Sequence, residues 1–221
     1  MINRPQPSAI RLLQTLILSC LSFSSFANEA ALYDLAPPDS AFLRIINLQK
    51  NTTTEEIALH IGNKRLSTGA YCSASEFIYL PAGDYSQQMN GLPWKGILQP
   101  GKAYSLLVGD KTVTLLKDYR AEDSRRGMLV VYNFSNRSKL SLTTAKSARP
   151  VLTHIRQNAS AARGINPLKS AFSVVDSGDI EAVSLALTKA MIFQPGVLSS
   201  LFICSDQSGL FTRWADRVGG R

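Results

Sequence analysis

Short apolar or alternating runs recur along the chain from residue 42 onward, separated by Gly, Pro, Asn and Asp about every 8 to 12 residues. This spacing is typical of all-β sandwiches and barrels. The segment 181–191 comes closest to an amphipathic helix, but its Thr and β-branched content leaves its class ambiguous. The pattern predicts strands over residues 42–47, 56–61, 76–80, 103–108, 112–116, 128–134, 139–143, 151–155, 169–175, 182–187 and 198–204.

An internal repeat relates the two halves of the chain. The segment 97–101 (Ile-Leu-Gln-Pro-Gly), followed by 105–108 (Ser-Leu-Leu-Val), recurs 95 residues later as Ile-Phe-Gln-Pro-Gly and Ser-Leu-Phe-Ile. The Pro-Gly pairs predict turns, because Pro fixes φ and Gly accepts a positive φ. The offset of 95 also matches Phe77 with Phe172 and Gly83-Asp84 with Gly178-Asp179, and an offset of 86 matches 43–48 with 129–134.

The repeat and a polar, charged stretch at 120–127 divide the chain. They predict two tandem, related antiparallel β-sandwich domains. We expect a signal peptide over 1–27, a first module over 28–120, a linker over 121–126 and a second, basic module over 127–221.

The first 27 residues have the pattern of a secretory signal peptide. Two arginines precede a short apolar run, and small residues at 25 and 27 suit signal peptidase, so we expect cleavage after Ala27. A transmembrane anchor is the alternative, but polar residues interrupt the run and a spanning helix needs about 20 apolar residues. Cys20 weakly resembles a lipoprotein cleavage site, although Leu18 is bulky for its position. We therefore expect Sec-dependent export to the periplasm.

Removing the leader changes how the charge is distributed. The full chain has 221 residues and a net charge of +8, whereas the residues after Ala27 carry 22 basic and 16 acidic side chains. Residues 28–126 hold 11 basic and 11 acidic residues, and 127–221 hold 11 basic and 5 acidic. If the basic residues share a face, they form a positive surface for a polyanion such as an anionic polysaccharide, for an acidic partner protein or for an anionic headgroup. The alternative is a set of solvated residues spread over several loops. Seven follow one another without an intervening acid: Arg137, Lys139, Lys146, Arg149, Arg156, Arg163 and Lys169.

Two cysteines, Cys72 and Cys204, remain once Cys20 leaves with the leader. An even number in an oxidising compartment is compatible with a disulfide. The alternative is a pair of separate, buried small side chains, because sequence does not show how closely the two backbones approach.

The sequence contains no pattern of a catalytic or metal site. His60 and His154 stand in separate runs, and neither a G-x-S-x-G motif nor an Asp-x-x-His pair is present. Ser177-Gly178-Asp179 has its letters in the wrong order for a Gly-Asp-Ser nucleophile. No zinc or calcium spacing occurs, and no stacking motif interleaves the basic residues as in nucleic-acid-binding proteins. We expect a protein that is not an enzyme and that uses no cofactor, metal or nucleic acid.

Three stretches of the mature chain carry a family resemblance. They are Leu32-Tyr33-Asp34; Pro37-Pro38-Asp39-Ser40-Ala41-Phe42-Leu43-Arg44 with Asn47; and Arg163-Gly164-Ile165-Asn166-Pro167-Leu168-Lys169. They resemble the alginate O-acetylation protein family AlgF and its relatives in operons for acetylated cellulose. The resemblance implies a periplasmic accessory protein that works with a membrane-bound acyl transferase and periplasmic acetyltransferases on an exopolysaccharide. It carries over no catalytic residues, although Arg44, Arg163 and Asn166 stand in its motifs.

Two functional hypotheses follow. In the first, the protein is an adaptor that holds acetylation proteins, or the polymer, near the acetyl donor and so raises an effective concentration. In the second, it is a carbohydrate-binding module on which sugar rings stack against exposed aromatic side chains, with Trp94, Trp214 and Tyr71 as candidates. Binding of a polyuronate through the basic residues should weaken with salt, whereas neutral cellulose would require the aromatic residues.

Overall fold

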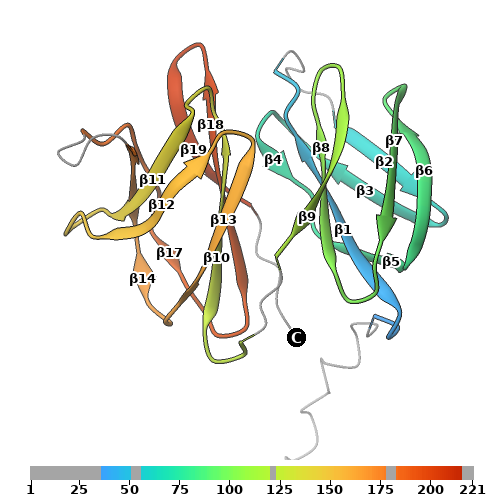
Figure 1. Ribbon diagram of the computed structural model, residues 1–221, viewed down its shortest axis with the longest axis horizontal. Coiled ribbons are helices and arrows are strands. Elements are labelled where there is room, and N and C mark those ends of the chain that lie inside the picture. Colours follow the sequence, from blue (N-terminus) through green and yellow to red (C-terminus); the bar gives the residue numbers. More distant parts are fainter. Residues whose placement is uncertain (1–35, 51–55, 120–122, 178–182, 216–221) are drawn as a thin grey trace, which may run out of the picture. The chain divides into compact units, whose positions relative to one another are not determined.

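β-Strands are the only regular elements among the residues that the computed structural model describes, which are 36–50, 56–119, 123–177 and 183–215 (Figure 1). The all-β prediction is therefore confirmed. The predicted leader with its cleavage site after Ala27, the 32–34 motif and Gly178-Asp179 lie outside the described residues. Within them, no helix is long and apolar enough to cross a membrane.

The first half is built around the strand β1. This strand pairs with β4 and β5 on one side and with β8 on the other, and β9 follows β8 at the sheet edge. The hairpins β2–β3 and β6–β7 form two further two-stranded sheets. The bounds are β1 Ser40–Asn47, β2 Ile57–Ile61, β3 Lys64–Thr68, β4 Ser73–Ala74, β5 Ile78–Pro81, β6 Gly83–Met89, β7 Leu92–Leu98, β8 Ala103–Val108 and β9 Val113–Asp118.

The second half is built in the same way around the strand β10. One sheet has the order β13-β10-β18-β19, a second has the order β12-β11-β15-β16, and β14 pairs with β17. The predicted strand 169–175 is divided between β14 and β15, and the described part of 181–191 contains no helix. The bounds are β10 Gly127–Phe134, β11 Lys139–Thr144, β12 Pro150–Arg156, β13 Ala159–Ile165, β14 Lys169–Ser170, β15 Phe172–Asp176, β16 Ala186–Leu187, β17 Met191–Ile192, β18 Leu198–Asp206 and β19 Gly209–Trp214.

Two strand pairs depart from the antiparallel arrangement that the sequence predicts. β1 runs parallel to β8, with Leu43 opposite Tyr104, and β10 runs parallel to β18, with Leu129 opposite Ser199. Parallel neighbours need a long connection between them. In each half this connection contains hairpins and shorter strands. The sheets built around β1 and β10 are therefore mixed, whereas the β12-β11-β15-β16 sheet is purely antiparallel.

The repeat is visible in the turns that precede β8 and β18. Gly101 and Gly196 have φ values of 68° and 69°, which confirms the left-handed turns predicted from Pro-Gly. The Gly101 amide donates to the carbonyl of Ser40 at 2.8 Å, and the Gly196 amide donates to the carbonyl of Arg126 at 2.9 Å. Matching turns therefore tie β8 to the start of β1 and β18 to the start of β10.

The offset of 86 extends beyond the segments matched in the sequence. Cys72 donates its backbone N–H to the Asn47 carbonyl at 2.7 Å, and Asn158 donates to the Asn133 carbonyl at the same distance. Both donors have positive φ values, 64° and 57°. The match of Phe77 with Phe172 at offset 95 is wrong as a structural equivalence, because β5 after Phe77 pairs with β1 whereas β15 pairs with β11.

Three clusters of buried side chains make up the core. One lies within the first half, around Leu43 and Trp94, and one within the second half, around Leu142 and Phe193. The third combines the two halves, since it contains Ile46 of β1 together with many residues of β10 and β18. From Pro37 onward the chain forms one compact unit, and the module boundary at 121–126 stays a prediction.

Candidate functional site

The seven basic residues of the second half lie in separate places. Lys139 on β11 is directly opposite Arg156 on β12, and Arg137 precedes them in the same loop region. Lys146 and Arg149 belong to the turn at the other end of this hairpin, and the two ends of a six-residue strand lie about 17 Å apart. Arg163 is on β13 and Lys169 on β14. Of the seven, Arg163 lines a groove.

This groove has a volume of about 470 Å³. The edge strands β12 and β13 contribute to it, together with the end of β11 and the segment after β13. One of the motifs that carry the family resemblance, Arg163 to Leu168, supplies much of its lining. We call it the basic groove; it is lined by Arg126, Thr144, Pro150, Val151, Arg163, Gly164, Ile165, Asn166 and Leu168.

Two guanidinium groups give the basic groove its charge. Arg163 lies opposite Leu129 of β10, and its Nη1 donates to the Val151 carbonyl of β12 at 2.7 Å, which spans the two edge strands. Arg126 immediately precedes β10, and its side chain passes close to Gly164, where an added Cβ would lie 3.5 Å from the Arg126 Cδ. Within the described part of the chain, no carboxylate forms an ion pair with either arginine.

Asp123 is the acidic residue nearest in sequence to Arg126 among those described. Its carboxylate accepts a hydrogen bond from the Arg125 backbone N–H at 2.9 Å and pairs with the Arg125 guanidinium. These hydrogen bonds, the backbone one first, lower the pKa of Asp123, and the charges of Arg125 and Arg126 act in the same direction. Asp123 therefore stays ionised at neutral pH and is engaged chiefly by Arg125.

The basic groove can hold an anion next to an apolar group. Guanidinium groups bind carboxylates through paired, charge-assisted hydrogen bonds, and the Asn166 amide adds an uncharged donor. The Thr144 hydroxyl is already bonded to the Ser147 hydroxyl and the Arg149 backbone N–H. Leu168 is 45% exposed at the rim. The lining includes no aromatic ring.

A buried polar network joins the two halves around Arg44, which is 1% exposed. Its Nη2 bonds Asp118 of β9 at 2.8 Å and Tyr132 of β10 at 2.7 Å. Its Nε donates to the Ser105 hydroxyl at 2.8 Å and its Nη1 to the Ser200 hydroxyl at 3.1 Å. Ser105 and Ser200 are equivalent positions of the repeat, so one arginine bridges the matching strands β8 and β18.

The surroundings of Arg44 neutralise its charge without solvent. The Asp118 carboxylate also accepts hydrogen bonds from Ser105 and Tyr132, and its side chain is fully buried. The Phe77 ring lies 4.5 Å from the guanidinium carbon. Burial raises the pKa of Tyr132 well above its usual range, so the phenol keeps its proton. The network therefore acts as a structural brace that solvent does not reach.

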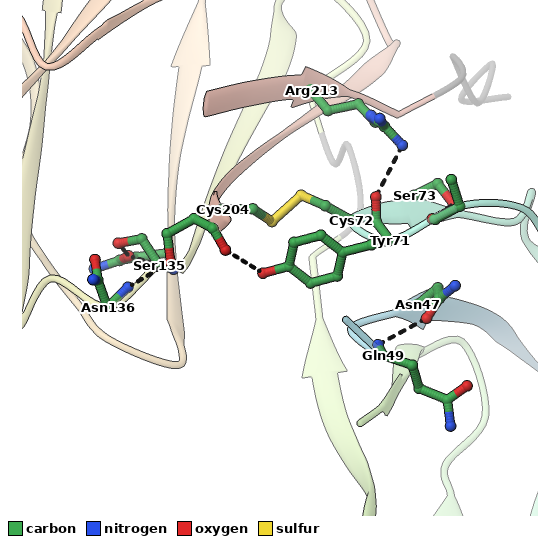
Figure 2. Close-up of a disulfide and its surroundings, with 12 residues drawn as sticks. Asn47, Gln49, Tyr71, Cys72, Ser73, Ser135, Asn136, Cys204 and Arg213 are labelled. Atoms are coloured by element: carbon green, nitrogen blue, oxygen red, sulfur yellow. Dashed lines mark hydrogen bonds between the residues drawn. A yellow bond between two sulfur atoms is a disulfide. The ribbon is translucent and has the colours of Figure 1, made fainter. Parts of the chain in front are cut away.

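A disulfide between Cys72 and Cys204 forms a second link between the halves (Figure 2). Tyr71, next to it, donates its hydroxyl to the Ser205 carbonyl at 3.1 Å. Arg213 of β19 donates to the Tyr71 carbonyl at 2.9 Å. Both cysteines are fully buried within the third core cluster, so covalent, polar and apolar contacts join the halves in the same region.

The three aromatic candidates for sugar stacking occupy different environments. Trp94 is 3% exposed and packs in the core of the first half beside Tyr85, so it presents no open ring face. The Tyr71 ring packs edge-on against Phe211. Trp214 is partly buried against Phe172, and its indole N–H donates to the Lys189 carbonyl at 3.0 Å.

Trp214 also lines a second groove, of about 560 Å³, between β16 and β19. Leu187, Phe211 and Arg213 are among its other lining residues. This groove and the basic groove involve different edge strands of the second half, so the half offers two separate concave surfaces.

Several residues of these sites were not expected from the sequence. Arg126 falls within the predicted linker, and only its position directly before β10 brings it to the basic groove. Asp118 and Tyr132 complete the Arg44 network from 74 and 88 residues away. The signal in the sequence was Arg44, a charged residue in an otherwise apolar strand, because a buried arginine requires a partner of opposite charge or hydrogen-bonding groups.

Comparison with known proteins places the chain in a family. Residues 15–192 match the model of the family described as "Alginate O-acetyl transferase AlgF". The chain belongs to the AlgF family. The alginate biosynthesis protein AlgF of Pseudomonas fluorescens is 27% identical over 217 residues, with 94% of each chain covered. That of Pseudomonas aeruginosa is 31% identical over 185 residues, which cover 80% of this chain and 82% of the relative.

One solved structure is also similar. It is the C-terminal domain of AlgF from P. aeruginosa, 24% identical, with a TM-score of 0.35 and 41% of this chain and 96% of that chain covered. Family membership links the chain to alginate biosynthesis and O-acetylation. Five residues of the Arg163–Lys169 motif, first noted as a family resemblance, thus line an open, positively charged groove in a member of that family.

Proposed function

We propose that this protein is a non-catalytic periplasmic adaptor in the O-acetylation of a bacterial exopolysaccharide, alginate or a related polymer. Its partners are the membrane-bound acyl transferase and the periplasmic acetyltransferases of the same system. Membership of the AlgF family supports the pathway. The observation that carries the adaptor role is the firm connection between the two halves.

A rigid connection is what an adaptor of this kind requires. The disulfide, the Arg44 network and the third core cluster all restrain the halves with respect to each other. Two binding surfaces on a rigid body keep a set spacing, and this raises the effective concentration of one partner near the other. A flexible linker would give a lower effective concentration, because the ends of a flexible chain sample a larger volume.

The cluster of hydroxyl and carboxylate groups that most resembles a catalytic site among the described residues supports a non-catalytic role. The Asp118 carboxylate accepts hydrogen bonds from the hydroxyl groups of Ser105 and Tyr132, an arrangement that resembles a nucleophile with its partners. However, all three side chains are hydrogen-bonded to the buried Arg44, and Ser105 is itself fully buried. A substrate would have to disrupt the brace between the halves to reach them.

The proposal is tested in cells and with the purified chain. Deleting the gene should abolish acetyl esters on the exopolysaccharide without stopping polymer synthesis, and the affinity-tagged mature protein should recover a periplasmic acetyltransferase of the same operon. The purified chain alone should not cleave or transfer acetyl groups. Unchanged acetyl content in the deletion strain would contradict the pathway, and ester turnover by the purified chain would contradict the non-catalytic role.

A further inference from the structure

We infer that the basic groove is the docking site for an acidic, apolar-containing segment of a partner protein. This inference rests on the proposed adaptor function and adds the surface and the chemistry of its partner. In the groove, two guanidinium groups, the Asn166 amide and the exposed apolar side chain of Leu168 line one concave surface.

Charge complementarity identifies the partner's polar groups. Arg126 and Arg163 line one groove, and neither pairs with a carboxylate of the described residues. Lys146 and Arg149, both exposed, lie in the turn that follows Thr144 of the lining. Such a site attracts Asp or Glu side chains, and arginine binds a carboxylate with two parallel hydrogen bonds.

The apolar rim distinguishes a protein segment from a polysaccharide. Leu168 exposes 45% of its surface, and Pro150, Val151 and Ile165 of the lining add further apolar area. Protein interfaces combine a central apolar contact with arginine-rich polar groups. A neutral polysaccharide would need an aromatic face for stacking, which the groove lining lacks. A polyuronate could use the two arginines but would leave the exposed Leu168 without an apolar contact. The observations therefore favour an acidic peptide segment with an apolar side chain that contacts Leu168.

The backbone around the groove is well anchored. The carbonyl of Arg126 accepts a hydrogen bond from Gly196, and Phe193 donates to the Leu168 carbonyl at 2.8 Å. The groove wall is thus tied to the turn before β18. A preformed site of this kind loses little conformational entropy when a partner binds.

The test uses the full mature chain in cells that make the polymer, with the photoreactive residue p-benzoylphenylalanine in place of Leu168. A second probe replaces Ile97, which is 66% exposed on β7 of the first half. After illumination, the cross-linked peptides are sequenced. We expect the probe at 168 to cross-link to a segment with Asp or Glu residues in a protein of the acetylation system.

Charge-reversed variants decide whether the groove arginines are responsible. Arg126→Glu/Arg163→Glu should reduce the cross-linked fraction at position 168 by at least about tenfold. Arg137→Glu/Arg156→Glu makes the same change in charge away from the groove and should leave the fraction unchanged. Because Arg163 also bonds Val151, the single variant Arg126→Glu is included as well. The Arg126 side chain makes no such bond to the described residues, and its replacement should still reduce cross-linking about fivefold.

Several results would overturn the inference. These are a cross-linked segment without carboxylates, cross-linking to polysaccharide, equal effects of the groove and control variants, or no cross-link at 168 in a strain that acetylates normally. If the probe at 97 or the affinity tag still recovers an acetyltransferase in such a case, the adaptor proposal stands and only the groove assignment fails. Normal acetylation in the deletion strain would instead contradict the adaptor proposal itself.

Discussion

Replacing both Cys72 and Cys204 with alanine should strongly lower the free energy of unfolding. The disulfide joins residues 132 positions apart, and the loop-closure entropy of a chain of that length corresponds to about 5 kcal/mol. Residual order in the denatured chain reduces this value, whereas loss of the buried sulfur atoms adds about 1 kcal/mol through poorer packing. We therefore expect a net loss of about 3 to 5 kcal/mol.

Guanidinium unfolding followed by tryptophan fluorescence measures this loss and also locates it. Trp94 packs in the core of the first half and Trp214 against that of the second, so variants that keep one tryptophan report each half separately. The disulfide-free variant should show a larger denaturant dependence, because its unfolded chain exposes more surface.

The wild-type protein unfolded in the presence of a reductant is the matched control. It should have the same stability as the alanine variant to within about 1 kcal/mol, the packing contribution of the two sulfur atoms. Stabilities of the oxidised and reduced wild type that agree within about 1 kcal/mol would refute the account, since the cross-link would then restrain nothing that the other contacts do not.

Three further predictions concern the brace and the repeated turns. Arg44→Met leaves the Asp118 carboxylate buried without its cation and should lower the free energy of unfolding by about 3 to 5 kcal/mol in denaturant unfolding. The double variant Arg44→Met/Asp118→Leu should recover most of this loss. Equal losses in the two variants would show that the ion pair is not the cause. Gly101→Ala and Gly196→Ala place a side chain at positive φ and should each lower the free energy of unfolding by about 1 to 2 kcal/mol. Gly69→Ala should not, because the backbone there has no such φ and the space around it is open. A similar loss at Gly69 would contradict the role of the turns. The folded protein keeps the Tyr132 proton that the unfolded chain releases above about pH 10. The free energy of unfolding should therefore fall as the pH rises beyond that value, and it should fall less steeply in Tyr132→Phe. Parallel pH profiles of the two proteins would contradict the burial of this phenol.

The strands that the sequence predicts best are those with the longest apolar runs. β1, β8, β10 and β18 are buried almost throughout, because one face of each meets its own half's core and the other meets the third cluster. β6 is largely exposed and contains two glutamines, so its pattern resembles a loop. Its pairing with β7 through Asn90-Gly91, both at positive φ, was nevertheless readable as a hairpin turn.

The candidate sites were less predictable than the strands because they depend on register. Arg163 meets Val151 only through the packing of two edge strands, and Arg126 approaches Gly164 only because Met128 pairs with Gly164. Charge counting pointed to the half of the chain that contains the basic groove, but the basic residues that it listed lie at both ends of a hairpin and on two further strands. Trp94, one of the three candidates for sugar stacking, is instead part of the core, since a large ring stabilises the fold more when it is buried than when it is exposed.

In the proposed function, one rigid molecule holds two acetylation proteins at once. The most direct measurement immobilises a periplasmic acetyltransferase of the same system, saturates it with the purified mature chain, and then adds the detergent-solubilised membrane-bound acyl transferase in a binding assay. We predict an additional, stable binding step that requires the chain and is lost when the chain is omitted. Release of the chain by the second protein, or no second step at saturating concentration, would contradict the adaptor account.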